Sequence, residues 1–233
     1  MNYVKAGDIL NILENEHIYS ANGIIKMTLN DISVRVKQRD TIGNILQEWL
    51  GEFLKKNNIY FRSAVGQTFP DFYLSEEENT NLCEMKSFIA KNGPAFDIAN
   101  FFGYIDSLRD HAYRLDSDYL IFSYTSSEEG VIKIDKIWCK KVWEITGSSR
   151  EFPLNCQRKK GQIYNIRPVR WMSEKENIIK PFPSKEKFIA ALYKTLLSTN
   201  NQVNVTRQWL SEVTDSYKVF SGEDMTNEIK KYL

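Results

Sequence analysis

Two charged side chains inside an apolar stretch constrain the fold of this chain more than any other feature. Residues 82–88 have the composition of a buried strand, and its apolar members are Leu82, Cys83, Met85 and Phe88. Glu84 and Lys86 interrupt this stretch, and because side chains alternate across a strand, both point to the same face. A carboxylate and an ammonium group are costly to bury unless each has a partner, a metal ion or a catalytic role.

The segment before this strand supplies a second carboxylate. Asp71 follows Pro70 at the start of what reads as a short strand, 13 positions before Glu84. The acidic residues 76–78 between them fit an exposed loop, so a hairpin would bring the two carboxylates together. Two carboxylates on neighbouring strands suit Mg²⁺, which prefers oxygen ligands. The alternative is structural: a cross-strand ion pair between Glu84 and Lys86, with Asp71 capping a turn.

The order of Pro-Asp, acidic loop, apolar strand and Glu-x-Lys resembles the catalytic motif of the PD-(D/E)XK nuclease superfamily. The matching residues are Pro70-Asp71 and Glu84-Met85-Lys86. The resemblance implies that Asp71 and Glu84 bind one or two Mg²⁺ ions, with the backbone carbonyl of Met85 as a further ligand. It also implies that Lys86 positions the attacking water or stabilises its hydroxide form. Asp71, Glu84 and Lys86 are therefore the expected catalytic residues.

The periodicity of the chain predicts an α/β fold around this motif. The expected elements are, in order, a helix at 41–57, strands at 59–65, 69–74 and 82–88, a helix at 95–110 and a strand at 120–124. This αβββαβ order matches the nuclease superfamily and predicts a mixed β-sheet flanked by helices. Residues 131–138 are expected to form a hairpin with 120–124, and residues 184–233 are expected to form a helical C-terminal extension.

One acidic residue of the first predicted helix is a candidate for the metal site. Glu48 and Glu52 both lie off the apolar stripe of that helix. In related nucleases a glutamate on this helix sometimes joins the metal site, which makes Glu48 an accessory candidate. The alternative for both residues is ordinary solvated helix charge.

The charge of the chain is balanced overall but locally basic. The formal net charge is only +1, yet residues 131–170 contain ten Lys and Arg against three acidic residues. Such a local excess predicts an electrostatic attraction to DNA. Arg, Lys, Asn and Gln also read base edges in the major groove. The expected DNA-binding residues are Arg158, Lys159, Lys160, Gln162, Tyr164, Asn165, Arg167 and Arg170. The alternative is a solvated loop that happens to be basic.

The composition argues against several other classes of protein and of site. The three cysteines are widely spaced, which argues for a reduced, cytoplasmic protein without disulfides or a zinc site. His17 and His111 are the only histidines and lie far apart in sequence, so a histidine-based catalytic triad is not expected. The chain begins without a basic and apolar leader, and no apolar run approaches 18 residues, so no membrane span is expected.

Several longer strings resemble one family of type II restriction endonucleases, the NgoBV/NlaIV-like enzymes. They lie at 43–50, 70–74, 96–101, 120–124 and 161–168. The resemblance implies a homodimeric, Mg²⁺-dependent endonuclease that cuts a short palindromic site in double-stranded DNA and leaves 5′-phosphate ends. It also implies a cognate DNA methyltransferase as genetic partner. The usual target of the family is similar to GGNNCC, and the residues leave the target of this chain open.

The expected organisation is one nuclease domain over residues 1–233. Its parts are a catalytic core at about 41–125, a basic DNA-contacting region at about 131–171 and a helical region at about 184–233. Two other functions remain compatible with the sequence. One is a structure-specific repair or junction-resolving nuclease of the same superfamily, and the other is a DNA-binding protein without catalysis.

Overall fold

The computed structural model describes residues 1–37, 41–66, 68–199 and 203–233. The chain divides into two compact units. The first contains Met1–Pro94 and Asp118–Lys140, and the second contains Ala95–Ser117 and Lys141–Leu233. The sequence therefore leaves the first unit after residue 94, returns to it at 118 and leaves it again after 140.

A mixed sheet organises the first unit, as expected. Its strand order is β1-β9-β8-β6-β5-β4. The strands are β1 (Gly23–Ile24), β4 (Arg62–Ser63), β5 (Phe72–Tyr73), β6 (Leu82–Ile89), β8 (Asp118–Ser126) and β9 (Val131–Lys141). Strands β6 and β8 are parallel, whereas β4–β5 and β5–β6 are antiparallel. Parallel pairing requires a crossover, and residues 90–117 supply it by passing through the second unit.

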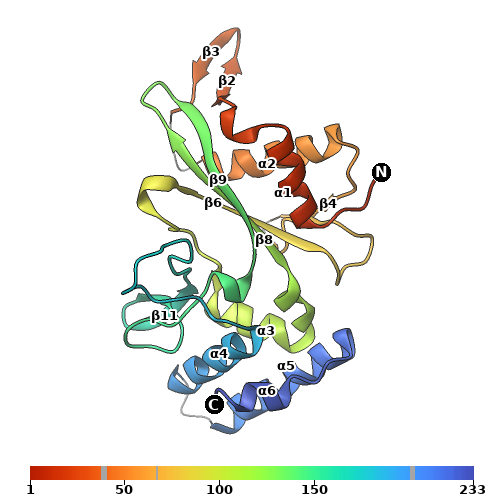
Figure 1. The fold of residues 1–233 in the computed structure, drawn as a ribbon, viewed down its shortest axis with the longest axis vertical. Helices are drawn as coiled ribbons and strands as arrows, with labels where there is room; N and C mark the ends of the chain where they lie inside the picture. The colour runs from red at the N-terminus through yellow and green to blue at the C-terminus, as the bar shows by residue number, and fades with distance from the viewer. Residues whose placement is uncertain (38–40, 67, 200–202) are drawn as a thin grey trace. The chain divides into compact units, whose positions relative to one another are not determined.

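Two helices, α1 (Ala6–Asn15) and α2 (Ile42–Lys56), pack on this sheet (Figure 1). The predicted apolar stripe of residues 41–57 becomes the buried face of α2, with Leu50 and Leu54 fully enclosed. These side chains share one hydrophobic cluster with Phe72 of β5 and Met85 of β6. The helix stripe therefore anchors the strand pair that carries the predicted motif.

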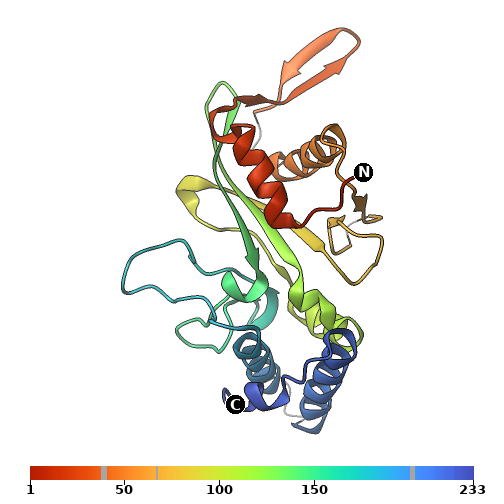
Figure 2. The ribbon, with the colours of Figure 1, turned by 45° about the vertical axis from the view of Figure 1, so that its right-hand side comes forward.

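A hairpin of β2 (Lys26–Leu29) and β3 (Ile32–Arg35) projects from the first unit (Figure 2). Every residue of both strands is exposed.

The first predicted core strand, 59–65, is shorter than expected, because only Arg62–Ser63 pairs with β5 and Ile59 makes an isolated bridge to Asn2. Short edge strands of this kind leave few unpaired backbone groups.

The second unit combines helices with a small sheet. Its elements are β7 (Ala99–Asn100), α3 (Phe101–Asp110), β10 (Cys156–Lys159), β11 (Gln162–Ile166), α4 (Lys185–Thr199), α5 (Val203–Ser221) and α6 (Thr226–Lys230). The small sheet has the order β10-β11-β7. Short 3₁₀ turns at Ala112–Asp116 and Val142–Glu144 complete this unit, and a third at Ile18–Ser20 and a fourth at Ala90–Asn92 belong to the first. The predicted helical C-terminal extension is confirmed.

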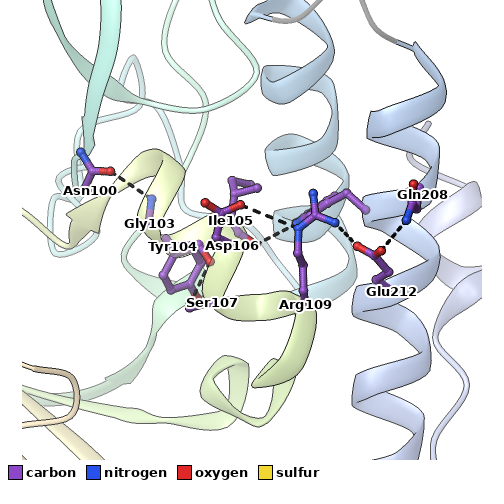
Figure 3. A network of polar contacts seen from close by, with 10 residues as sticks. Asn100, Gly103, Tyr104, Ile105, Asp106, Ser107, Arg109, Gln208 and Glu212 are labelled. Atoms are coloured by element: carbon purple, nitrogen blue, oxygen red, sulfur yellow. Dashed lines mark hydrogen bonds and ion pairs between the residues drawn. The ribbon is translucent and has the colours of Figure 1, made fainter.

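The predicted helix over residues 95–110 is wrong in its first turn. Residues before 101 are extended, because Ile98 donates its backbone N–H to Ile166 and Ala99 pairs with the same residue of β11. Asn100 then caps α3, since its side chain accepts a hydrogen bond from the N–H of Gly103 at 3.0 Å (Figure 3). Apolar spacing alone cannot separate this extended segment from the helix, because both contribute buried apolar side chains, Ile98 before the helix and Phe101 and Ile105 within it.

Helices α3 and α5 are joined by polar contacts as well as by packing. Arg109 of α3 forms an ion pair with Glu212 of α5, and Gln208 donates to the same carboxylate at 2.8 Å (Figure 3). Trp209 is fully buried and donates its indole N–H to the Ile105 carbonyl at 2.9 Å. The aromatic residues Trp209 and Tyr217 therefore belong to the core of this unit. In the described part of the chain, no helix is long and apolar enough to cross a membrane.

Candidate active site

The hairpin of β5 and β6 brings the two predicted carboxylates together. Phe72 pairs with Cys83, which places Asp71 beside Glu84 at the start of the pairing. The backbone N–H of Asp71 donates to Glu84 Oε2 at 3.2 Å, and the N–H of Met85 donates to Asp71 Oδ2 at 2.8 Å. Each carboxylate is therefore held by the backbone of the other strand, so the register of the hairpin fixes their separation.

Lys86 completes the group from the same strand as Glu84. Its Nζ lies 2.7 Å from Glu84 Oε1, and the two side chains share one face of β6 as alternation requires. The ion pair runs along one strand and not across two, unlike the structural alternative weighed from the sequence. Glu84 is only 7% exposed, so its carboxyl group meets Lys86 in a largely desolvated setting.

Burial controls the protonation of both carboxyl groups. Desolvation raises the pKa of Glu84, opposed by the Lys86 ammonium and reinforced by the negative charge of Asp71. Desolvation also raises the pKa of Asp71, opposed by its hydrogen bonds and by Lys86. Two carboxylates share a single ammonium group, so when both are ionised the cluster keeps an excess negative charge.

Sequence reasoning missed one side chain of this cluster. Gln47 of α2 donates its Nε2–H to Asp71 Oδ1 at 2.9 Å. The sequence contains a weak signal for it, since Gln47 is a polar residue next to the buried stripe of α2. Glu48, the accessory candidate, is exposed, and Glu52 pairs with Lys55 at 2.6 Å.

A polar cavity of about 310 Å³ lies beside the cluster. Its lining includes Gln47, Glu48, Glu52, Ser63, Thr68 and Asp71. Glu48 therefore lines the same cavity as Asp71, although the side chain of α2 that donates a hydrogen bond to Asp71 is Gln47. Over the described ranges, no group of three or more His, Cys, Asp or Glu side chains is arranged to hold a metal ion.

The predicted DNA-binding residues lie mainly on the β10–β11 hairpin of the second unit. Lys160 and Gly161 form its turn, both with positive φ, as two-residue hairpin turns require. Five of the predicted side chains are exposed on the hairpin: Arg158, Lys159, Lys160, Gln162 and Tyr164. Arg170, beyond the hairpin, is exposed as well. Six of the eight predicted residues are thus exposed.

Aromatic rings support two of these cations. The guanidinium of Arg158 lies 3.6 Å from the ring centre of Phe152, and Lys159 Nζ lies 3.7 Å from that of Tyr164. Such cation–π contacts orient long side chains that would otherwise be mobile. The hairpin therefore presents ordered positive charge.

Two of the predicted DNA-binding residues are half-buried and contact other residues of the second unit. Arg167 is half-buried and forms an ion pair with Asp97. Asn165 is also half-buried and pairs with Asn100 of β7. Asn100 in addition donates to the Tyr164 carbonyl at 3.1 Å. These contacts attach the hairpin to the segment that precedes α3.

The fold defines the class of protein first. A solved structure, the NlaIV restriction endonuclease, matches it with a TM-score of 0.91 and 36% sequence identity, covering 100% of this chain and 97% of the other. The fold is therefore that of a restriction endonuclease. The chain belongs to the NgoBV restriction endonuclease family, whose sequence model matches residues 3–232.

Two curated relatives agree with this assignment. The chain is 38% identical to the type II restriction enzyme NlaIV of Neisseria lactamica over 209 residues, which are 89% of this chain and 86% of that enzyme. It is 39% identical to the type II restriction enzyme NgoBV of Neisseria gonorrhoeae over 153 residues, 64% of this chain and 86% of that enzyme. The predicted family, fold class and enzyme class, a type II restriction endonuclease, are confirmed.

Proposed function

We propose that this enzyme hydrolyses double-stranded DNA at a specific sequence, with Asp71, Glu84 and Lys86 as its catalytic residues and Mg²⁺ as its cofactor. The observation that carries the proposal is the pairing of β5 with β6, which holds Asp71 and Glu84 within one hydrogen bond of each other. The relatives are type II restriction enzymes, which supports site-specific cleavage of DNA.

The donor set fits a hard divalent cation. Two carboxylates offer the oxygen ligands that Mg²⁺ prefers, and Asp71 and Glu84 carry more negative charge than Lys86 neutralises. Their raised pKa values reflect this unbalanced burial, which a cation would relieve. A bound Mg²⁺ supplies Lewis-acid chemistry, polarising the phosphate group and making a water molecule more acidic. With only two carboxylates in contact, water and DNA phosphate would complete its ligands.

Lys86 is placed to stabilise negative charge near the two carboxylates. Its ammonium is held 2.7 Å from Glu84 on a buried strand, so its orientation is fixed before substrate binds. A preorganised cation stabilises negative charge that develops during phosphodiester hydrolysis and orients the attacking water. These contributions are the ones that the motif resemblance implies for the lysine.

The β10–β11 hairpin is the proposed DNA contact. Its exposed Arg158, Lys159 and Lys160 supply positive charge for the phosphate backbone. Gln162 and Tyr164 are exposed on the next strand, where an amide and an aromatic ring add contacts to DNA. The remaining expectations belong to the same proposal: a homodimer, 5′-phosphate products and a cognate methyltransferase that protects the host DNA.

Digestion of unmethylated, phage-length duplex DNA tests the proposal. The parent protein should give a reproducible band pattern in Mg²⁺ and none in EDTA, and Asp71→Ala should give none in either. Sequencing of the fragment ends would give the target, the stagger and the position of the phosphate. Cutting of branched DNA without discrete bands from linear DNA would instead indicate a structure-specific nuclease. Absence of cutting and of Mg²⁺ binding would leave a DNA-binding protein without catalysis.

A further inference from the structure

Gln47 contacts the candidate site from an element that the motif does not include. It lies on α2, and its side-chain amide donates to Asp71 Oδ1 at 2.9 Å. Gln47 is half-buried, in the wall of the polar cavity beside Asp71. The helix that carries it is fixed to the sheet by the buried Leu50 and Leu54. Its amide is therefore presented to Asp71 by a rigid support.

The two oxygens of Asp71 are held from two directions. Oδ1 accepts from Gln47 on α2, while Oδ2 accepts from the backbone N–H of Met85 on β6. Two donors on separate oxygens define the plane of the carboxylate. The backbone donor cannot be lost by substitution, whereas the Gln47 donor can. Gln47 is thus the replaceable half of the arrangement.

The neighbouring acidic residue does not take this position. Consecutive helix residues face different directions, and Glu48 is exposed where Gln47 reaches Asp71. An amide at this point has a clear chemical advantage over a carboxylate. It donates a hydrogen bond without adding negative charge to a cluster in which two carboxylates already share one ammonium.

We propose that Gln47 is a positioning residue of the active site, which holds the Asp71 carboxylate in its orientation against Glu84 by donating a hydrogen bond to Oδ1. This inference rests on the proposed function of Asp71 as a metal-binding catalytic residue. The hydrogen bond also favours the ionised form of Asp71 and so opposes the effect of burial.

Three variants separate this role from packing. Gln47→Met keeps the length of the side chain but removes the donor, and Gln47→Glu replaces the donor with a charge that repels Asp71. Asn44→Ala, on an exposed position of the same helix, is the control. Circular dichroism and thermal melting establish that each variant is folded. Loss of a partner that orients a metal ligand typically costs about 10–100-fold in activity or metal affinity.

The cleavage assay has a specific expected pattern. Gln47→Met should lower kcat by about 10–100-fold and raise the Mg²⁺ concentration that gives half the maximal rate. KM for DNA should stay unchanged, and Gln47→Glu should lose at least as much activity at pH 7. A Gln47→Met or Gln47→Glu variant with parental kinetics overturns the proposal. So does a lower rate with unchanged Mg²⁺ dependence.

A measurement without catalysis completes the test. Carbon-13 NMR of the metal-free protein at a fixed pH of 8 can report the environment of the Asp71 carboxyl carbon. Its chemical shift should differ in Gln47→Met from that of the parent and the Asn44→Ala control, because the hydrogen bond to Oδ1 is lost, and an unchanged shift overturns the proposal. Failure of the proposed function looks different: the parent itself then shows no Mg²⁺-dependent cleavage, while the NMR comparison still decides whether Gln47 acts on Asp71.

Discussion

The two charged regions of this enzyme solve opposite electrostatic problems. In the first unit, Asp71, Glu84 and Lys86 are grouped at a buried strand, and Glu84 is largely shielded from solvent. In the second unit, Arg158, Lys159 and Lys160 of the β10–β11 hairpin are exposed, and two of them lie against aromatic rings. A buried charge needs a fixed partner at short range, whereas an exposed charge acts mainly through the sum of many like charges.

This difference predicts how substitutions in each region should affect the enzyme. Removing one member of the buried group changes a site in which each carboxylate is held by hydrogen bonds from its neighbours. Removing one exposed cation subtracts a single contact from several. The candidate active site should therefore respond with large losses of rate that are insensitive to salt, and the hairpin with small losses of affinity that depend on salt.

The largest effect is expected from the carboxylates. Asp71→Asn and Glu84→Gln keep the size of the side chains but replace one accepting oxygen by an NH₂ group and remove the charge that binds Mg²⁺. The kcat should therefore fall by about 10³-fold or more, the scale for loss of an essential catalytic group. Binding to a specific duplex in Ca²⁺ or EDTA should persist within a few-fold. Single-turnover cleavage and fluorescence anisotropy measure the two quantities. Substantial cleavage by either variant would show that the substituted carboxylate is not essential for catalysis.

A somewhat smaller effect is expected at Lys86. Replacing it with methionine removes the ammonium but retains the aliphatic stem, so cleavage should slow by about 10²–10³-fold. The same change leaves Glu84 buried without its ion-pair partner, and Glu84 should then titrate at higher pH. Single-turnover rates from pH 6 to 9 test both expectations. A Lys86→Met enzyme with a parental rate would leave the ion pair with a structural role alone.

Substitutions in the β10–β11 hairpin should cause small losses of DNA affinity that depend on salt. Arg158→Ala, Lys159→Ala and Lys160→Ala are each expected to weaken DNA binding several-fold at low salt. Each should also reduce the slope of log K against log [salt] by about 0.9, the value for one phosphate contact. The maximal rate at saturating DNA should remain that of the parent. If a single substitution instead abolished cleavage at saturation, the hairpin would belong to the catalytic apparatus and the comparison would break.

The ion pair between Arg167 and Asp97, which attaches the hairpin to the segment before α3, allows a further test of its role. Arg167 was predicted to bind DNA, but it forms an ion pair with Asp97. If the pair serves to hold the hairpin, Asp97→Asn should reduce DNA affinity although it removes a negative charge, which simple electrostatics would predict to increase affinity. Anisotropy titrations at two salt concentrations measure this. An increase in affinity for Asp97→Asn would indicate that Arg167 is freed to contact DNA, as the sequence suggested.

The sequence predicted the buried group well because strand alternation and hairpin pairing are local rules. Glu84 and Lys86 had to share a face, and Asp71 had to lie within reach of Glu84 once the acidic loop closed a hairpin. Gln47 could not be found in this way, because its contact with Asp71 depends on how α2 packs on the sheet. That packing is a tertiary property without a periodic signal.

The same distinction explains what the sequence did not show in the second unit. Residues 96–99 carry an apolar pattern compatible with a helix, and only pairing with β11 makes them extended. The basic residues of the hairpin were identified by composition, which reports charge but not contact. Composition could not show that Arg167 meets Asp97 while Lys160 is exposed at a turn. Local rules therefore gave the strands, and long-range pairing decided which charges remain exposed.

The smallest predicted effect concerns stability, and it tests whether the buried group is strained in the absence of a cation. Burial raises the pKa of Asp71 in the folded state. A raised pKa means that the folded state favours the protonated form, so this group contributes most at acid pH and its contribution is lost as pH rises through the folded pKa. Asp71→Asn removes the penalty of the ionised form.

Metal-free Asp71→Asn should therefore melt above the parent at pH 8, by roughly 2–4 °C if the gain is about 1 kcal/mol in a chain of this size. The difference should shrink toward pH 4. Mg²⁺ should raise the Tm of the parent, because a ligand that binds only the folded state stabilises it, and should have little effect on the variant. Differential scanning fluorimetry at several pH values measures both. A variant that is less stable than the parent at pH 8 would show that the hydrogen bonds of ionised Asp71 outweigh its desolvation, and that the buried carboxylates are a stabilising pair before any cation binds.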